Sequence, residues 1–141
     1  MAGKITFTII KPSAVKNGYT GPILAKIHEA GFKIIALKYM HLSLKQIQDF
    51  YKIHNGKAFY EKLVEYMSSG PVVLAILEKD NAVEEYRKLL GSTDPGSADE
   101  GTLRKLFGTG LPMNGLHGSD SDENAIIESD YFFSKLERFH Y

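Results

Sequence analysis

The stretch Lys4–Ile10, KITFTII, with Lys11-Pro12-Ser13 after it, decides the fold of this chain. Polar and apolar residues alternate along it and β-branched side chains are frequent, which predicts a β-strand over Lys4–Ile10. Because a proline cannot continue a central strand, Pro12 ends the strand and leaves Lys11 at its carboxyl edge. Loops at strand ends commonly carry functional residues, so Lys11 is a candidate site residue. The alternative is a solvated charge at a strand end.

Further along the chain, extended and helical patterns alternate. Two more strands are predicted, over Lys33–Met40 and over the continuously apolar Val72–Leu77. Amphipathic periodicity with caps and glycine stops predicts six helices. They cover Gly21–Ala30, Ser43–Ile53, Ala58–Met67, a segment from Asp80 or Asn81 through Leu90, Thr102–Phe107, and about Asp122–Asp130.

This order predicts an α+β fold: a ferredoxin-like βαββαβ sandwich, with a four-stranded antiparallel sheet and helices on one face. The helices within residues 43–67 form an inserted hairpin, and Gly91–Gly101 is an inserted long polar loop. The length suits one core and no internal repeat appears, so we expect residues 1–141 to form a single domain. The end of the chain, Tyr131–Tyr141, is apolar enough to dock on that domain.

Composition limits the function classes. Seventeen basic residues balance 17 acidic ones, so no global field favours nucleic acid or an anionic membrane, and any anion site must be local. The absence of cysteine excludes a disulfide framework, thiol catalysis and thiolate metal sites. No signal-type core is present, and no apolar stretch approaches the roughly 18 residues of a membrane span. We expect a cytoplasmic protein.

The segment Asn114–Ser121, NGLHGSDS, places one imidazole between glycines and directly before hydroxyls and a carboxylate. With a pKa near ~6.5, much of a histidine is neutral at pH 7 and one ring nitrogen can attack an electrophile. Gly115 and Gly118 would let a bulky charged group approach the ring. We interpret His117 as a covalent nucleophile. A turn histidine before a surface helix capped by Ser119–Ser121 remains the alternative from this segment alone.

Phosphate binding is suggested by the arginines. Only Arg87, Arg104 and Arg138 occur beside 14 lysines, and the guanidinium fork binds phosphate oxygens in a way that lysine cannot reproduce. Arg87 and Arg104 flank the long polar loop that contains Thr93, so the three could converge on a polyphosphate. For either arginine taken singly, a charge on a helix surface is the favoured interpretation. No glycine-rich phosphate loop is present, so side chains would have to hold the phosphate.

Aromatic side chains gather in the predicted hairpin. Tyr51 and His54 lie three apart and project from one side of a helical turn, and Phe59 follows after a break at Asn55-Gly56. Such a hairpin can cover a cleft, although core packing is the default role of each aromatic.

Taken together, these motifs closely resemble the nucleoside diphosphate kinase family over essentially the whole chain. Each motif is modest alone, and their shared order and spacing are specific. The motifs are Thr8–Val15, Tyr51-x-x-His54 with Phe59-Tyr60, Ser69–Val73, Gly91–Pro95, Gly101–Arg104, Asn114-x-x-His117-Gly118-Ser119-Asp120-Ser121, and Glu128 downstream.

The resemblance implies reversible transfer of the γ-phosphate of a nucleoside triphosphate to a nucleoside diphosphate, in a ping-pong cycle through a pros-phosphohistidine on His117. Lys11 and Asn114 would contact the ribose and nearby phosphate, and Tyr51 would lie beside the histidine. Ser119 and Glu128 would orient it. The residues implied to hold the phosphates are Arg87, Thr93, Arg104 and His54, and Phe59 would stack on the base.

The same resemblance implies Mg²⁺ that arrives on the nucleotide phosphates, without metal ligands from protein side chains. It also implies a homo-oligomer, either a tetramer or a hexamer. Two segments depart from the family pattern: Ser13 stands where an aspartate is common, and Gly96–Glu100 differs in composition.

Two other hypotheses stay open at this point. A regulatory nucleotide-binding protein would keep the fold and bind nucleotide without forming a phosphohistidine. A phosphohistidine carrier would pass its phosphate to a protein partner and would not phosphorylate free diphosphates.

Overall fold

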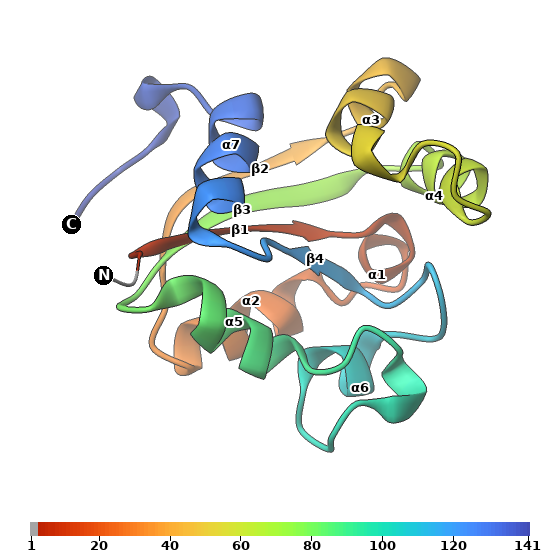
Figure 1. Cartoon of the computed structure of the whole chain (residues 1–141). Coiled ribbons are helices and arrows are strands. Elements are labelled where there is room, and N and C mark those ends of the chain that lie inside the picture. The colour runs from red at the N-terminus through yellow and green to blue at the C-terminus, as the bar shows by residue number, and fades with distance from the viewer. Residues whose placement is uncertain (1–2) are drawn as a thin grey trace.

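The computed structural model describes residues 3–141, and a four-stranded antiparallel sheet runs through its centre in the order β2-β3-β1-β4 (Figure 1). The strands are β1 (Ile5–Ile10), β2 (Lys33–Met40), β3 (Val72–Glu78) and β4 (Leu116–Gly118). β1 pairs with β3 along its whole length and with β4 from Thr8 to Ile10. This arrangement confirms the predicted α+β class and ferredoxin-like sheet.

Helices cover the sheet. They are α1 (Pro12–Lys16), α2 (Thr20–Glu29), α3 (Leu44–Phe50), α4 (Tyr60–Met67), α5 (Ala82–Leu90), α6 (Leu103–Phe107) and α7 (Asp122–Phe132), with 3-10 turns at Lys52–His54, Pro95–Ser97 and Lys135–Glu137. The two helices of the βαββαβ frame, α2 and α5, lie on the same face (Figure 1). Their buried side chains pack with Ile10 and with Val73, Ala75 and Leu77 of β3.

The two helices of the βαββαβ frame lie on one face of the sheet, as predicted, and α1 and α6 contribute Ala14 and Leu103 to the core on that face. The sequence did not indicate that other helices form a layer on the second face. The hairpin α3–α4 and the helix α7 lie on the opposite face (Figure 1). The reason is that β3 is apolar on both faces: Leu74 and Ile76 point away from Ala75 and need a cover of their own. The insertion and the C-terminal helix provide that second layer.

Local signals explain most helix starts. Ser43 forms a capping box with Gln46 at α3, and the Ser121 hydroxyl accepts from the Asn124 backbone N–H at α7, at 3.0 Å. Asn81 occupies the position before α5, but its side chain accepts no backbone N–H there. Pro12 does more than end β1. It opens the short α1, because a proline is tolerated in the first turn of a helix.

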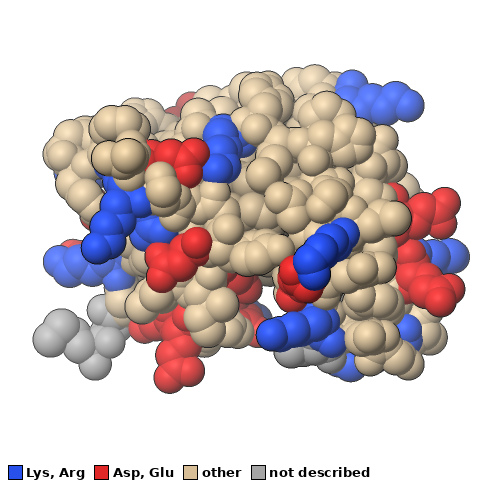
Figure 2. Space-filling view, turned by 90° about the horizontal axis from the view of Figure 1, so that it is seen from above, with Lys and Arg blue, Asp and Glu red and all other residues tan. Residues whose placement is uncertain are grey.

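The C-terminal segment docks only in part. Phe133 is buried, and the Phe139 backbone N–H donates to the carbonyl of Ile35 in β2, at 2.8 Å. Leu136 and Tyr141, in contrast, are 89% and 71% exposed. On the face that carries α7 and α3, charges of both signs are interspersed and no large area carries a single sign (Figure 2). Within residues 3–141, no helix has the length and apolar character to cross a membrane.

Candidate active site

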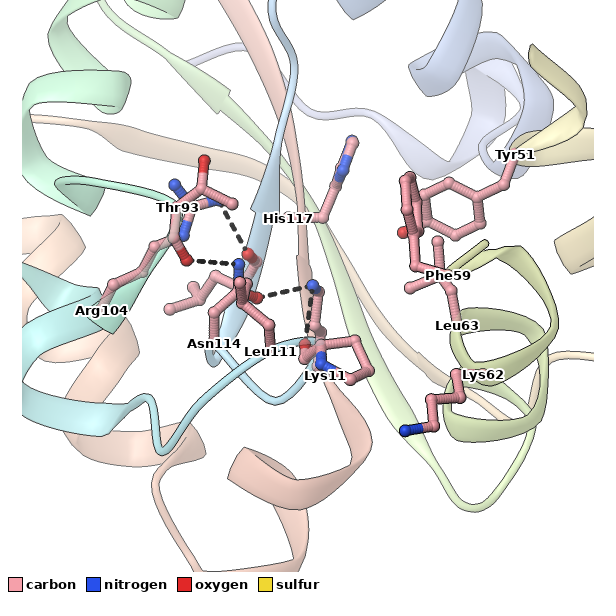
Figure 3. Close-up of a pocket in the computed structure, with 12 residues that line it drawn as sticks. Lys11, Tyr51, Phe59, Lys62, Leu63, Thr93, Arg104, Leu111, Asn114 and His117 are labelled. Atoms are coloured by element: carbon pink, nitrogen blue, oxygen red, sulfur yellow. Dashed lines mark hydrogen bonds between the residues drawn. The ribbon is translucent and has the colours of Figure 1, made fainter. Parts of the chain in front are cut away.

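A cavity of about 420 Å³ opens between the α3–α4 hairpin and the ends of β1 and β4. Figure 3 shows that side chains from distant parts of the chain face this common space. Its lining consists of Lys11, Tyr51, Phe59, Lys62, Leu63, Thr93, Arg104, Leu111, Pro112, Asn114, Leu116 and His117. The structure therefore brings together seven of the residues that the sequence singled out.

A second, more polar cavity of about 440 Å³ shares Thr93 and Arg104 with the first. Its other lining residues are Arg87, Leu90, Gly91, Ser92, Gly118 and Asp120. The two cavities meet at the shared residues, so the site has an apolar end beside the hairpin and a cationic end beside α5.

His117 is held through one ring nitrogen. Its Nε2 lies 2.8 Å from Glu128 Oε1, and the Ser119 hydroxyl donates to the same oxygen, also at 2.8 Å. An ionised carboxylate only accepts hydrogen bonds, so Nε2 carries the proton and Nδ1 keeps a free lone pair. The rings of Phe50 and Tyr51 surround the imidazole, with centroids 5.2 and 6.1 Å away. The geometry thus leaves one nitrogen available as a nucleophile.

Lys11 is almost completely buried. Its Nζ donates to Asn114 Oδ1 at 2.6 Å and to the Pro112 carbonyl at 3.2 Å. The Asn114 amide in turn donates to the Thr93 carbonyl at 2.9 Å, as the dashed lines in Figure 3 trace. Burial, and secondarily the charge of Arg104, lower the pKa of Lys11 from 10.5 to about 7. Lys11 is therefore no solvated strand-end charge.

The two arginines differ in how firmly they are fixed. Arg104 donates to the carbonyls of Gly91 and Leu116, both at 3.1 Å, and its burial lowers its pKa. Its Nε is buried without a hydrogen-bond partner among residues 3–141. Arg87 is exposed and makes one long contact, 3.4 Å, to the Asp120 carbonyl. A partly buried guanidinium with two hydrogen bonds and an exposed guanidinium with one long contact thus face the same polar space.

His54 does not line either cavity in this structure. Its ring packs against Tyr51 and Phe59, with centroids 6.1 and 5.4 Å apart, and its Nδ1 is 3.3 Å from Lys57 Nζ. Burial and, after it, the neighbouring Lys57 charge lower the pKa of His54. Its predicted contact with phosphate stays a prediction.

Gly115 and Gly118, on the two sides of His117, are suited to their positions for different physical reasons. Gly115 has a φ of 91°, a left-handed conformation that glycine adopts readily. At Gly118, a Cβ would lie 2.6 Å from Leu90 Cδ1 and 3.2 Å from a ring carbon of Tyr86. Close packing of α5 against β4 therefore requires Gly118, a reason that the sequence interpretation did not give.

Sequence reasoning missed several residues at the site. Lys62 and Leu63 line the cavity one turn after Phe59, and their spacing along the predicted helix could have indicated this.

Ser13 keeps a hydrogen bond at the strand end despite replacing the common aspartate. Its backbone N–H donates to the Tyr66 hydroxyl at 3.1 Å, and its hydroxyl contacts the same oxygen, which ties α1 to α4.

Sequence comparisons agree on one family. Residues 4–138 match the family model described as nucleoside diphosphate kinase. The chain is 52% identical over 139 residues to the nucleoside diphosphate kinase of Flavobacterium psychrophilum, an alignment that covers 99% of this chain and 100% of that protein. It is 46% identical over 137 residues to the nucleoside diphosphate kinase of Persephonella marina, an alignment that covers 97% of this chain and 98% of that protein.

Solved structures give the same result. The Aquifex aeolicus nucleoside diphosphate kinase superposes with a TM-score of 0.94 at 39% identity, over 96% of this chain and 99% of that chain. A halophilic nucleoside diphosphate kinase from Halobacterium salinarum was solved in complex with CDP. It superposes with a TM-score of 0.94 at 31% identity, over 98% of this chain and 92% of that chain.

The fold and the comparisons define an enzyme that transfers phosphate between nucleotides. The chain belongs to the nucleoside diphosphate kinase family. The predicted reaction, in which the γ-phosphate passes from a triphosphate to a diphosphate by a ping-pong mechanism through a phosphohistidine, is confirmed at the level of the family.

Proposed function

We propose that His117 is the residue that carries the phosphoryl group, on Nδ1. The observation that supports this most is the contact between His117 Nε2 and Glu128, which fixes the proton on one nitrogen and leaves the lone pair on the other. Nδ1 forms a bond to the γ-phosphorus while the bond from that phosphorus to the bridging oxygen breaks. The electron pair leaves with the nucleoside diphosphate, and the reverse step phosphorylates the acceptor.

Glu128 stabilises the charge that develops on the ring. As Nδ1 donates its lone pair, positive charge spreads to Nε2–H, and the carboxylate 2.8 Å away neutralises it. Ser119 donates to the same carboxylate oxygen and so holds it in place. Tyr51 packs on the imidazole and restricts its rotation.

We place the nucleotide along the two joined cavities. Phe59, which is half exposed at the apolar end, stacks on the base, and any base offers a suitable face. Lys11 and Asn114, which already share a hydrogen bond, contact the ribose hydroxyls and the nearest phosphate. The remaining phosphates lie at the cationic end, held by Arg87, Thr93, Arg104 and, at the rim, His54.

We propose that Mg²⁺ binds to the site together with the nucleotide. Within residues 3–141, no group of three or more histidine or acidic side chains is arranged to hold a metal ion. The ligands of the ion would be phosphate oxygens and water, in the polar cavity lined by Arg87 and Arg104. When bound there, Mg²⁺ supplies neutralisation of phosphate charge.

The assembly and location of the enzyme are also proposed. A homo-oligomer is supported by exposed apolar side chains on the edge strand β2 and the C-terminal segment. They are Leu37, Tyr39, Leu136, Phe139 and Tyr141, called the apolar edge from here on. The choice between tetramer and hexamer, and a cytoplasmic location, stay predictions.

The first test is the intact mass of the protein after brief incubation with ATP and Mg²⁺, followed by a nucleoside diphosphate. We expect one acid-labile phosphoryl group, discharged by the diphosphate and missing in His117→Ala. His28→Ala, an exposed histidine on α2, is the matched control and should behave as the wild type.

Two outcomes would contradict the proposal. A phosphoryl group that no diphosphate removes would favour a phosphocarrier. Nucleotide binding without any phosphoryl group would favour a regulatory protein.

A further inference from the structure

β1 carries two buried threonines on the same face, Thr6 and Thr8, and neither has exposed surface. The two hydroxyls differ in their partners. Thr6 Oγ1 has no hydrogen-bond partner among residues 3–141. Thr8 Oγ1 lies 2.7 Å from the Tyr86 hydroxyl of α5 and 2.7 Å from the His117 carbonyl oxygen of β4.

The direction of these two hydrogen bonds follows from the groups involved. A carbonyl only accepts, so the single proton of the Thr8 hydroxyl is donated to the His117 carbonyl. The Tyr86 hydroxyl must then donate to Thr8. Burial raises the pKa of Tyr86, so this hydroxyl keeps its proton at neutral pH. A chain of donors therefore runs from Tyr86 through Thr8 to the backbone of His117, and in a buried environment each bond strengthens the next.

β4 has few other restraints. It contains three residues, lies at the edge of the sheet and, within the described part of the chain, pairs only with β1. A strand this short forms few ladder hydrogen bonds. The side-chain donors that reach its carbonyls, Arg104 at Leu116 and Thr8 at His117, are thus a large share of what fixes its backbone.

Tyr86 also sets the distance between α5 and β4. A Cβ at Gly118 would lie 3.2 and 3.3 Å from two ring carbons of Tyr86, so the ring already rests against the residue after His117. The next residue of α5 is Arg87, which lines the cationic cavity. One side chain therefore connects the helix that carries Arg87 with the strand that carries His117.

We infer that Tyr86 and Thr8 are positioning residues for phosphoryl transfer: their hydroxyls fix the backbone of His117 relative to Arg87. Neither residue touches the nucleotide in the proposed arrangement. The inference rests on the proposed role of His117. Small displacements of a nucleophile slow a transfer strongly, because the reacting atoms must be aligned at close range.

The test compares Thr8→Val with Thr6→Val. Both substitutions replace a buried hydroxyl by a methyl group on the same strand and face, but only Thr8 donates to the His117 backbone. We expect Thr8→Val to slow phosphohistidine formation about tenfold in single turnover at saturating ATP, which corresponds to about 1.4 kcal/mol. KM should stay within about twofold, because the phosphate ligands are unchanged. Thr6→Val should keep the wild-type rate, and Thr8→Ser should restore it.

A double variant separates positioning from stability. Thr8→Val leaves the Tyr86 hydroxyl buried without a partner, which lowers Tm, and adding Tyr86→Phe removes that unpaired group and raises Tm again. The transfer rate should remain low in the double variant, because the His117 carbonyl still lacks its donor.

Three results would overturn the inference. A rate that recovers with Tm in the double variant would mean that Thr8 acts on stability alone. An unchanged rate in Thr8→Val, with normal labelling of His117, would refute the positioning role while leaving the proposed function intact. A wild-type protein without phosphate on His117 would refute the proposed function itself.

Discussion

At Lys11, an ammonium group lies almost entirely out of water between the Asn114 side chain and the Pro112 carbonyl. Burial disfavours its charged form and brings its pKa to about 7, so both protonation states exist at neutral pH. Between about pH 7 and the usual 10.5, the unfolded chain binds the extra proton. This group therefore makes the free energy of unfolding increase with pH in that range. A bound phosphate raises the pKa of Lys11 again, because its negative charge favours the protonated ammonium.

Nucleotide binding should consequently be accompanied by proton uptake at Lys11. At pH 8.5 the free enzyme has lost most of this proton and the phosphates of ADP are already ionised. We expect uptake of up to about one proton per site, measured by calorimetry in two buffers of different ionisation enthalpy. Lys11→Met should show markedly less uptake. Equal uptake in that variant would assign the proton to another group.

The negative charge of Glu128, beside His117 Nε2, is the second feature that can be tested at a single residue. Glu128→Gln keeps a hydrogen-bond acceptor for His117 Nε2 but removes the negative charge. A hydrogen bond to a charged group contributes about 1.5–3 kcal/mol, so transfer should slow by roughly tenfold to a hundredfold. Glu123→Gln, an exposed acid on the same helix, is the control. Wild-type rates in Glu128→Gln would show that the charge does not contribute.

At the scale of elements, the packing of α5 on β4 links the cationic end of the site to the histidine. The contact is tight at Gly118, where Leu90 and Tyr86 leave no room for a Cβ. The Ser13–Tyr66 contact fixes a different pair, α1 and α4, and so holds the hairpin beside the end of β1. The site thus depends on two helix contacts, one at Gly118 in the lining of its cationic end and one at Ser13 outside its lining.

Gly118→Ala should push α5 away from β4. Overpacking of this kind costs about 1–3 kcal/mol of stability, and the displaced strand should also slow transfer. Gly21→Ala is the matched control, because Gly21 lies in α2 with nothing within 4 Å of an added Cβ and has no positive φ. The control should raise the free energy of unfolding by about 0.5–1 kcal/mol. Chemical denaturation of both variants measures the difference. Equal stabilities would contradict the close approach at Gly118.

At the scale of the whole molecule, two hydrophobic cores lie on the two faces of one sheet. The side chains of the apolar edge belong to neither core and are exposed. Tyr39 and Phe139 are each 66% exposed although they are large apolar side chains. Such surface is typical of an interface between chains.

We expect the molar mass in solution, measured by light scattering, to be a multiple of the 15.8 kDa chain mass. Replacing Leu37 and Tyr39 by lysine should lower that mass, because charges would be buried at the apolar edge. Leu44→Lys changes an exposed leucine on α3 and should leave it unchanged. A wild-type protein with the mass of one chain would contradict the proposed assembly.

The sequence by itself determined the local features. A strand was predicted over Lys33–Met40, and the structure has β2 at the same bounds. Ser43 and the segment Ser119–Ser121 predicted the starts of α3 and α7, and Ser121 is the residue that caps α7. The strand bounds and helix starts depend on residues near one another in the chain, so periodicity and capping are sufficient to reveal them. The prediction that Lys11, Asn114 and His117 belong to one site came instead from the resemblance of the motifs to a known family.

Only the tertiary structure decided the rest. The layer of helices on the second face, the pKa of Lys11 and the chain from Tyr86 through Thr8 to His117 join residues separated by long stretches of sequence. Burial and hydrogen-bond partners of this kind depend on how the chain closes on itself. No local pattern indicates that the Thr8 hydroxyl has two hydrogen-bond partners while the Thr6 hydroxyl has none among residues 3–141.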